Sequence, residues 1–137
     1  MDDRRVDIFF YGLFMDAGVL RQHGIVPEHP RQAFVDGFAL RIGQRATLVP
    51  HEGSRAYGMI FALTPAEIDV LYDAPGLELY RAETVLAVTT SGAATPALCY
   101  NLREPPRPEE RDSEYAQRLR RTLRELQFPS DYVSSIE

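Results

Sequence analysis

Three strand-like segments follow one another between residues 33 and 63 with no helical pattern between them. The segments are AFVDGFALRIG, RATLVP and RAYGMIFAL, and each is rich in the branched and aromatic residues that pack well on a pleated sheet. A doubly wound parallel sheet needs strands and helices in regular alternation, which this run does not provide. The succession therefore favours an α+β domain over an alternating α/β fold.

Strand patterns also flank this run. The segment VDIFFYG begins with an apolar stretch that suits a buried strand, and it ends at Gly12. Two more strands, at residues 80–90 and 94–102, surround a short SGAA turn. Residues 25–32, which include two prolines, are predicted as a loop, and residues 51–54 as a turn. These patterns amount to about six strands.

The sequence TPAEIDVLY carries the clearest helix-start chemistry. Thr64 can cap the helix, Pro65 suits the first helical position, and Glu67 completes a capping box. A shorter helix is predicted after Asp16, which can cap it. Residues 103–111 form a charged, Pro-rich linker that leads to an amphipathic C-terminal helix.

The length and charge fit one compact unit. We predict a single α+β domain over residues 1–137, built as a small mixed β-sheet curled into a barrel with flanking helices. The net charge of −5 argues against a nucleic-acid partner. No apolar run approaches the ~20 residues that span a bilayer, and the N-terminus lacks the apolar stretch of a signal peptide. We therefore expect a cytoplasmic protein without membrane contact, monomeric or weakly dimeric.

Motifs for metal and cofactor chemistry are missing from the sequence. There is no Gly-rich phosphate loop and no GxSxG elbow. His23, His29 and His51 fall in loop-like segments without paired ligand spacing. Cys99 is the sole cysteine, which excludes an internal disulfide and favours a packed thiol. We predict no metal and no cofactor.

The segment FFYGLFMD, residues 9–16, is the remaining candidate for chemistry. A strand runs into Gly12 and then into a helix start, and such a turn can expose consecutive backbone N–H groups. A carboxylate or a developing oxyanion could bind there. The alternative is a plain strand–helix turn, in which Gly12 only allows the backbone to turn tightly.

Two segments together resemble the γ-glutamylcyclotransferase-like (AIG2-like) superfamily. FFYGLFMD is similar to the strand-end loop of that superfamily, and residues 56–88 are similar to its strand, helix, LDxxEG segment and Tyr-led strand. The resemblance spans roughly residues 6–102. It implies a barrel-like mixed sheet, no cofactor, and a small-molecule ligand bound by Tyr11, Gly12, Leu13, Phe14, Tyr80 and Tyr100.

Members of this superfamily release 5-oxoproline from γ-glutamyl amines, because the α-amine of the substrate attacks its own γ-carbonyl. A glutamate in LDxxEG is the implied general base. When this segment is aligned with LYDAPG, Leu71 and Gly76 match, Tyr72 replaces the aspartate, and Pro75 stands at the glutamate position. A proline side chain cannot take a proton, so this member lacks the expected catalytic glutamate.

Three functions remain open from the sequence. Glu78 could act as a relocated general acid/base if the turn before it swings its carboxylate toward the pocket. The same scaffold could instead bind a γ-glutamyl or other carboxylate-bearing metabolite with lost or altered catalysis. A protein-interaction module is the third alternative. The substitution at Pro75 favours the binding role.

Overall fold

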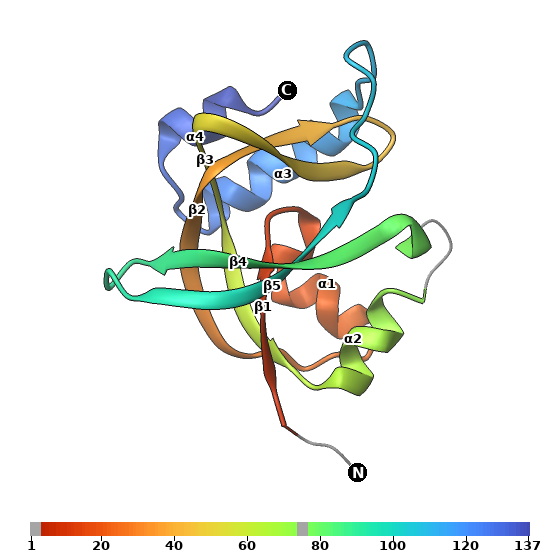
Figure 1. Ribbon diagram of the computed structural model, residues 1–137, viewed down its shortest axis with the longest axis vertical. Helices are drawn as coiled ribbons and strands as arrows, with labels where there is room; N and C mark the ends of the chain where they lie inside the picture. The colour runs from red at the N-terminus through yellow and green to blue at the C-terminus, as the bar shows by residue number, and fades with distance from the viewer. Residues whose placement is uncertain (1–3, 74–76) are drawn as a thin grey trace.

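The strands of the protein close into a barrel. The computed structural model describes residues 4–73 and 77–137, and within them five strands are hydrogen-bonded in the order β1–β3–β2–β4–β5 (Figure 1). Their bounds are Val6–Phe10 (β1), Glu28–Ile42 (β2), Ala46–Leu63 (β3), Tyr80–Thr89 (β4) and Ala94–Leu102 (β5). Neighbouring strands are antiparallel except β1 and β5, which are parallel. The predicted mixed, barrel-like sheet is confirmed.

The long hairpin of β2 and β3 corrects the predicted strand count. Residues 46–63 form one strand, so the two segments predicted as separate strands are continuous through residues 51–54. The pairing shifts at Gly37, whose neighbours on β2 lie opposite Arg55 and Pro50. Gly37 has φ 84°, which glycine adopts without strain. The hairpin therefore absorbs the extra residues as a bulge, where the sequence suggested a turn.

The loop predicted at residues 25–32 is also partly wrong. β2 begins at Glu28, and Arg31 already lies opposite Ile60 of β3. Pro30 falls inside the register shift between Glu28 and Arg31, where its missing N–H does not interrupt the ladder. The prolines thus mark an irregular strand start.

Short helices follow the strands, and their predicted caps are confirmed. Their bounds are Leu13–Met15 (η1), Ala17–Gln22 (α1), Pro65–Leu71 (α2), Leu77–Leu79 (η2), Ser113–Glu125 (α3) and Ser130–Ser135 (α4). The hydroxyl of Thr64 accepts the Glu67 N–H at 3.2 Å, and the Glu67 carboxylate accepts the Thr64 N–H at 2.9 Å. The Asp16 carboxylate caps α1 by accepting the Gly18 N–H at 2.8 Å.

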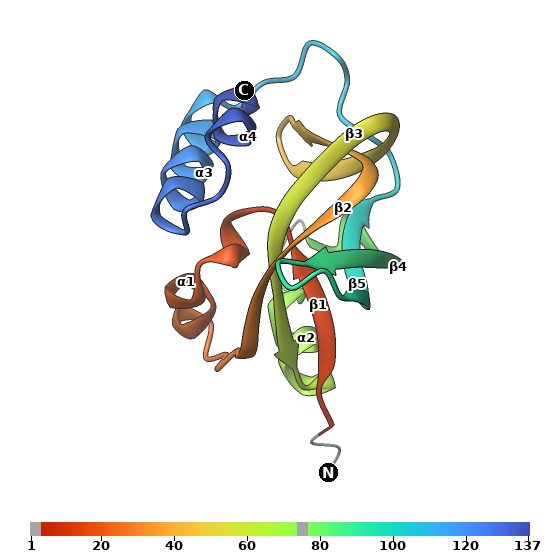
Figure 2. The same ribbon diagram turned by 90° about the vertical axis from the view of Figure 1, so that its left-hand side faces the viewer.

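The C-terminal helices pack against the barrel from one side. Figure 2 shows α3 and α4 together beside the long hairpin, with α1 below them on the same side. α3 buries Ala116, Leu119 and Leu123, and this apolar stripe confirms its amphipathic character. The Tyr57 ring of β3 lies 4.9 Å from that of Tyr132, between ring centroids. Among the described residues, no helix is both long and apolar enough to cross a membrane.

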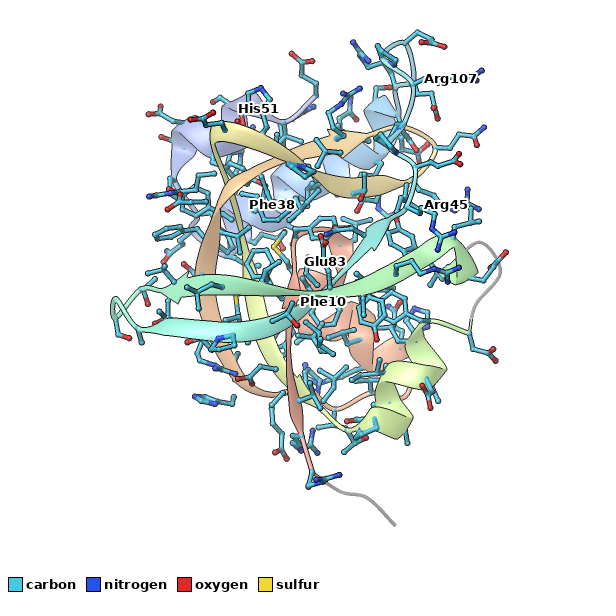
Figure 3. The ribbon with its side chains drawn as sticks, viewed as in Figure 1. Phe10, Phe38, Arg45, His51, Glu83 and Arg107 are labelled. Carbon is cyan, nitrogen blue, oxygen red and sulfur yellow. The ribbon has the colours of Figure 1, made fainter. Side chains whose placement is uncertain are left out.

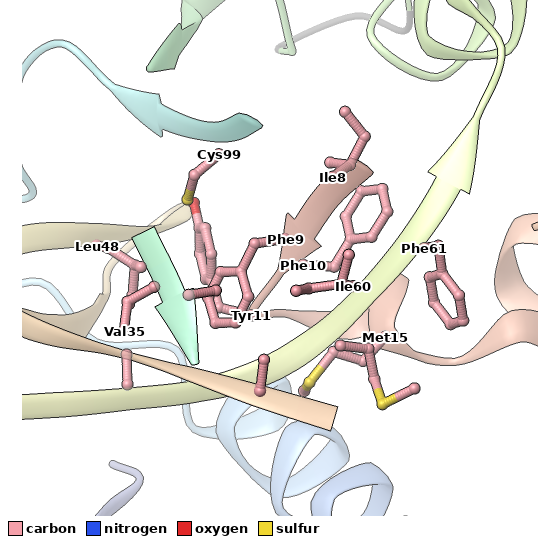
Figure 4. Close-up of a cluster of buried hydrophobic side chains, with 14 of the residues drawn as sticks. Ile8, Phe9, Phe10, Tyr11, Met15, Val35, Leu48, Ile60, Phe61 and Cys99 are labelled. Carbon is pink, nitrogen blue, oxygen red and sulfur yellow. The ribbon is translucent and has the colours of Figure 1, made fainter. Parts of the chain in front are cut away.

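β1 runs through the middle of the core. Ile8 and Phe9 are at most 1% exposed, and Figure 4 shows Phe9 and Phe10 among buried side chains from several strands. Cys99 of β5 is buried beside them, as predicted, and burial raises the pKa of its thiol to about 12. β1 therefore delivers the residues that follow Phe10 to a fixed position at one end of the barrel.

Candidate functional site

A cavity of about 320 Å³ opens where β1 ends. The structure brings together at this cavity every residue predicted to bind substrate: Tyr11, Gly12, Leu13, Phe14, Tyr80 and Tyr100. Tyr72 and Tyr115 add two further phenol rings, so that five tyrosines line the cavity. We call it the tyrosine cavity. A role in ligand binding for these residues stays a prediction.

Gly12 lets the far end of the chain reach the strand-end loop. A Cβ atom on Gly12 would collide with the hydroxyl oxygen of Tyr115, which comes from α3. That oxygen accepts a hydrogen bond from the Leu13 N–H at 3.3 Å. Glycine is therefore required here for close approach, and its φ of −112° is ordinary. One of the loop N–H groups expected to meet a ligand is already bonded to a tyrosine.

Two tyrosine hydroxyls point at backbone carbonyls on the cavity wall. Tyr11 donates to the Tyr100 carbonyl at 2.7 Å, and the Ala46 carbonyl lies 3.5 Å from the same hydroxyl. Tyr80 donates to the Ala46 carbonyl. Figure 4 shows the Tyr11 ring reaching across the core toward Cys99. These bonds tie the residue after β1 to the ends of β3 and β5.

The phenols of the cavity are protonated at neutral pH, as ordinary phenols are, and burial moves their pKa values further from neutrality. Burial raises the pKa of Tyr11 and Tyr72 well above the ordinary value of 10.0, and it raises that of Tyr80 in the same direction. The Arg45 charge lowers the pKa of Tyr80, but by less than burial raises it. No phenolate is therefore available at pH 7 to act as a general base.

Tyr72 occupies the position of the aspartate in the LDxxEG pattern, and here it builds the aromatic wall. Its ring stacks on that of Tyr100 at 3.9 Å between centroids and 14° between planes. The Phe14 ring meets it edge-on at 6.4 Å, and the Tyr80 ring lies at 6.3 Å. Such contacts hold the rings in place, so the wall is preorganised for an apolar or planar group.

The charged groups at the tyrosine cavity are cationic. Arg45, at the start of β3, and Arg118, on α3, line it together with Gln44. Figure 3 shows Arg45 at the rim, near the start of β4. No aspartate or glutamate lines the cavity among the described residues, and within residues 4–73 and 77–137 neither arginine makes an ion pair. An anionic group would complement this rim.

Glu78, the predicted general acid/base, lies outside the tyrosine cavity. It is an exposed residue of η2, and it lines an adjoining cavity of about 570 Å³ with Arg107 and Glu110. Only Leu77 of the same turn lines the tyrosine cavity. Pro75 and Gly76, on which the comparison with LDxxEG depends, lie outside the described residues.

The sequence analysis did not assign to the site several residues that line this cavity, among them Tyr72, Tyr115, Arg45 and Arg118. Tyr72 and Tyr115 have helical apolar neighbours, so their pattern indicates packing and carries no sign of a site. Arg45 and Arg118 belong to segments dominated by other features, a strand start and an arginine-rich helix face. Because Tyr115 reaches a loop 102 residues earlier in the chain, only the fold reveals the contact.

Comparisons with known proteins agree with this architecture. One solved structure is called "Gamma-glutamyl cyclotransferase"; it has a TM-score of 0.75 at 17% identity, over 97% of this chain and 88% of that one. YkqA from Bacillus subtilis has a TM-score of 0.78 at 20% identity, over 95% of this chain and 52% of YkqA. A γ-glutamyl cyclotransferase specific to glutathione from yeast has a TM-score of 0.67 at 14% identity, over 97% and 94%. At these identities the likeness establishes the fold.

The family model extends the resemblance beyond the segments that first suggested it. No curated protein gives a significant match to the chain. The model described as "Gamma-glutamyl cyclotransferase, AIG2-like" matches residues 8–119, which include both the strand-end loop and the part of α3 that carries Tyr115 and Arg118. This chain therefore belongs to the AIG2-like γ-glutamyl cyclotransferase family.

Proposed function

We propose that this protein binds a small carboxylate-bearing metabolite, of the γ-glutamyl type or related to it, in the tyrosine cavity, and that its catalysis is lost or altered. One observation carries the proposal: the described lining of the cavity offers cations and neutral hydroxyls but no carboxylate. Residues 74–76 are Ala, Pro and Gly, so they add no acid either.

The chemistry of the family explains why the missing acid matters. Cyclisation of a γ-glutamyl amine needs a base that removes a proton from the α-ammonium group before the amine attacks. Arginine stays protonated at any physiological pH, and burial holds the phenol pKa values above the ordinary 10.0. Binding requires less, because cationic side chains and an aromatic wall suffice to hold a carboxylate with an apolar body.

Thermal unfolding with a panel of ligands tests the proposal. The panel contains γ-glutamyl amines, γ-glutamyl amino acids and simple organic acids, and 5-oxoproline release is measured on the same samples. We expect at least one compound to raise the unfolding temperature without turnover; at tenfold excess over Kd the gain is about 1.4 kcal/mol. A panel that gives no stabilisation contradicts the binding role.

Active catalysis by Glu78 is the second candidate. It has one supporting observation: Leu77, the residue directly before Glu78 in η2, lines the tyrosine cavity. This candidate predicts release of 5-oxoproline by the unmodified protein and loss of that release in Glu78→Gln. Release that survives the substitution removes Glu78 from the mechanism.

A further inference from the structure

The hydrogen-bond polarity of the tyrosine cavity limits what its ligand can be. A phenol has one proton, and Tyr11 and Tyr80 both give theirs to backbone carbonyls, those of Tyr100 and Ala46. What their oxygens can still offer a ligand is lone pairs. These two phenols can therefore accept a hydrogen bond from a ligand but have no hydroxyl proton left to donate to it.

Tyr115 and Arg118, which line the same cavity, offer the reverse polarity. The Tyr115 oxygen already accepts the Leu13 N–H, and the described part of the chain supplies no acceptor for the Tyr115 proton. That proton is free for a ligand. Arg118 lies near enough for its charge to lower the pKa of Tyr115 against the larger effect of burial. A carboxylate could thus accept hydrogen bonds from the Tyr115 hydroxyl and the Arg118 guanidinium at the same time.

The donor that meets Tyr11 and Tyr80 should be uncharged. Arg45 lies beside Tyr80, and no carboxylate among the described lining residues would balance an ammonium group. Tyrosine faces can hold an ammonium ion, but one face of Tyr72 and one face of Tyr100 are covered because these rings stack on each other at 3.9 Å. A neutral N–H satisfies the same oxygens without a charge to desolvate.

We infer that the tyrosine cavity selects a carboxylic acid that also carries an uncharged amide N–H, such as an N-acyl amino acid, over a ligand with a free ammonium group. The amide N–H meets Tyr11 and Tyr80, and the carboxylate meets Tyr115 and Arg118. This inference rests on the proposed binding function and narrows its ligands to acids related to the γ-glutamyl type that lack the free ammonium group.

Four matched compounds test this selectivity by isothermal titration calorimetry. They are N-acetylphenylalanine, its N-methyl derivative without the N–H, its carboxamide without the carboxylate, and phenylalanine with the free ammonium; the alanine series repeats the set with a smaller body. We expect the N-acetyl acid of at least one series to bind about tenfold or more tightly than its three relatives, since a lost hydrogen bond to a charged or buried group costs on that order.

Two outcomes separate this inference from the proposed function. If γ-glutamyl amines bind and the free-amine compounds match or exceed the N-acetyl acids, the selectivity is wrong but the binding function stands. If neither the γ-glutamyl panel nor any of the matched compounds binds, both the selectivity and the proposed binding function are wrong.

Matched variants locate the two ends of the ligand. Tyr80→Phe should weaken the N-acetyl acid about tenfold and leave its N-methyl derivative unchanged. Arg118→Gln should remove the preference for acid over carboxamide, whereas Arg121→Gln, an exposed arginine on the same helix that does not line the cavity, should keep it. Circular dichroism melts confirm folding. Equal losses in Arg118→Gln and Arg121→Gln would show a general charge effect and contradict the assignment.

Discussion

Two adjoining cavities share Gln44 and Arg45 in their linings, and they differ in the other chemical groups that line them. The tyrosine cavity has aromatic walls, neutral hydroxyls and arginines. Its neighbour, which we call the acidic cavity, is lined by three glutamates, Glu78, Glu104 and Glu110, among arginines and prolines. Arg45 lines both, so the cavity with the predicted ligand-binding residues and the cavity with the carboxylates are separate but adjoin.

The comparison of the two cavities shows that a carboxylate close to the tyrosine cavity need not line it. Glu110 accepts backbone N–H bonds from Arg107 and Gln44, which lower its pKa, so it works as a structural acceptor. Glu78 is exposed and belongs to the same side. The family's chemistry needs a carboxylate at the substrate, and no described residue that lines the tyrosine cavity supplies one.

Returning the acid at position 75 should give the largest effect. Pro75→Glu restores the glutamate that the family pattern has at this position, and a positioned general base contributes about 10²–10⁴-fold. We expect 5-oxoproline release from a γ-glutamyl amine about a hundred times above the unmodified protein, since the rest of the pattern also departs. Pro75→Gln serves as the control without a carboxyl group. No gain in Pro75→Glu over this control would mean that the acid alone does not supply cyclotransferase activity to this chain.

Gly12→Ala should disrupt the tyrosine cavity and leave the acidic cavity intact. The new methyl group meets the Tyr115 hydroxyl, and overpacking of this kind costs about 2 kcal/mol, read from urea unfolding. Because the colliding atom is the hydroxyl oxygen, adding Tyr115→Phe should recover most of that loss. An equal cost of Gly12→Ala with and without Tyr115→Phe would show that another contact is responsible.

Ligand affinity at the tyrosine cavity should depend little on pH. Burial raises the pKa values of Tyr11, Tyr72 and Tyr80 above 10.0, so ligand affinity at the tyrosine cavity should change less than about twofold between pH 6 and pH 9. A folded-state pKa above the unfolded value means that stability is full below pH 10 and is lost as the pH rises through the folded values. Calorimetric titrations and urea melts measure both. A break in affinity near pH 7 would point to a titrating group that the tyrosine cavity does not contain.

Glu78→Gln should have the smallest effect. The side chain is exposed and lies in the acidic cavity, so ligand affinity at the tyrosine cavity should stay within about twofold and stability within about 0.5 kcal/mol. Glu104→Gln, which lines the same cavity, is the matched control. A selective loss of binding or turnover in Glu78→Gln would join the two cavities into one site.

Much of this architecture could be predicted from local patterns. The cap at Thr64, the strands around β1 and the loop at Gly12 each follow from neighbouring residues. The errors at Pro30 and at residues 51–54 arise because a bulge tolerates residues that otherwise signal a turn. Sequence spacing could not indicate that Arg118 and Arg45 face one cavity, since their association depends on how α3 docks on the barrel.

The hydrogen bond between Leu13 and Tyr115 joins residues 102 positions apart. Contacts of such span are costly in loop-closure entropy and form after local structure, so the tyrosine cavity acquires its last wall only when nearly the whole chain is made and folded. A nascent chain released before α3 would have the barrel strands without the complete cavity. A ligand that bound in the complete cavity would therefore stabilise only those molecules in which α3 has docked.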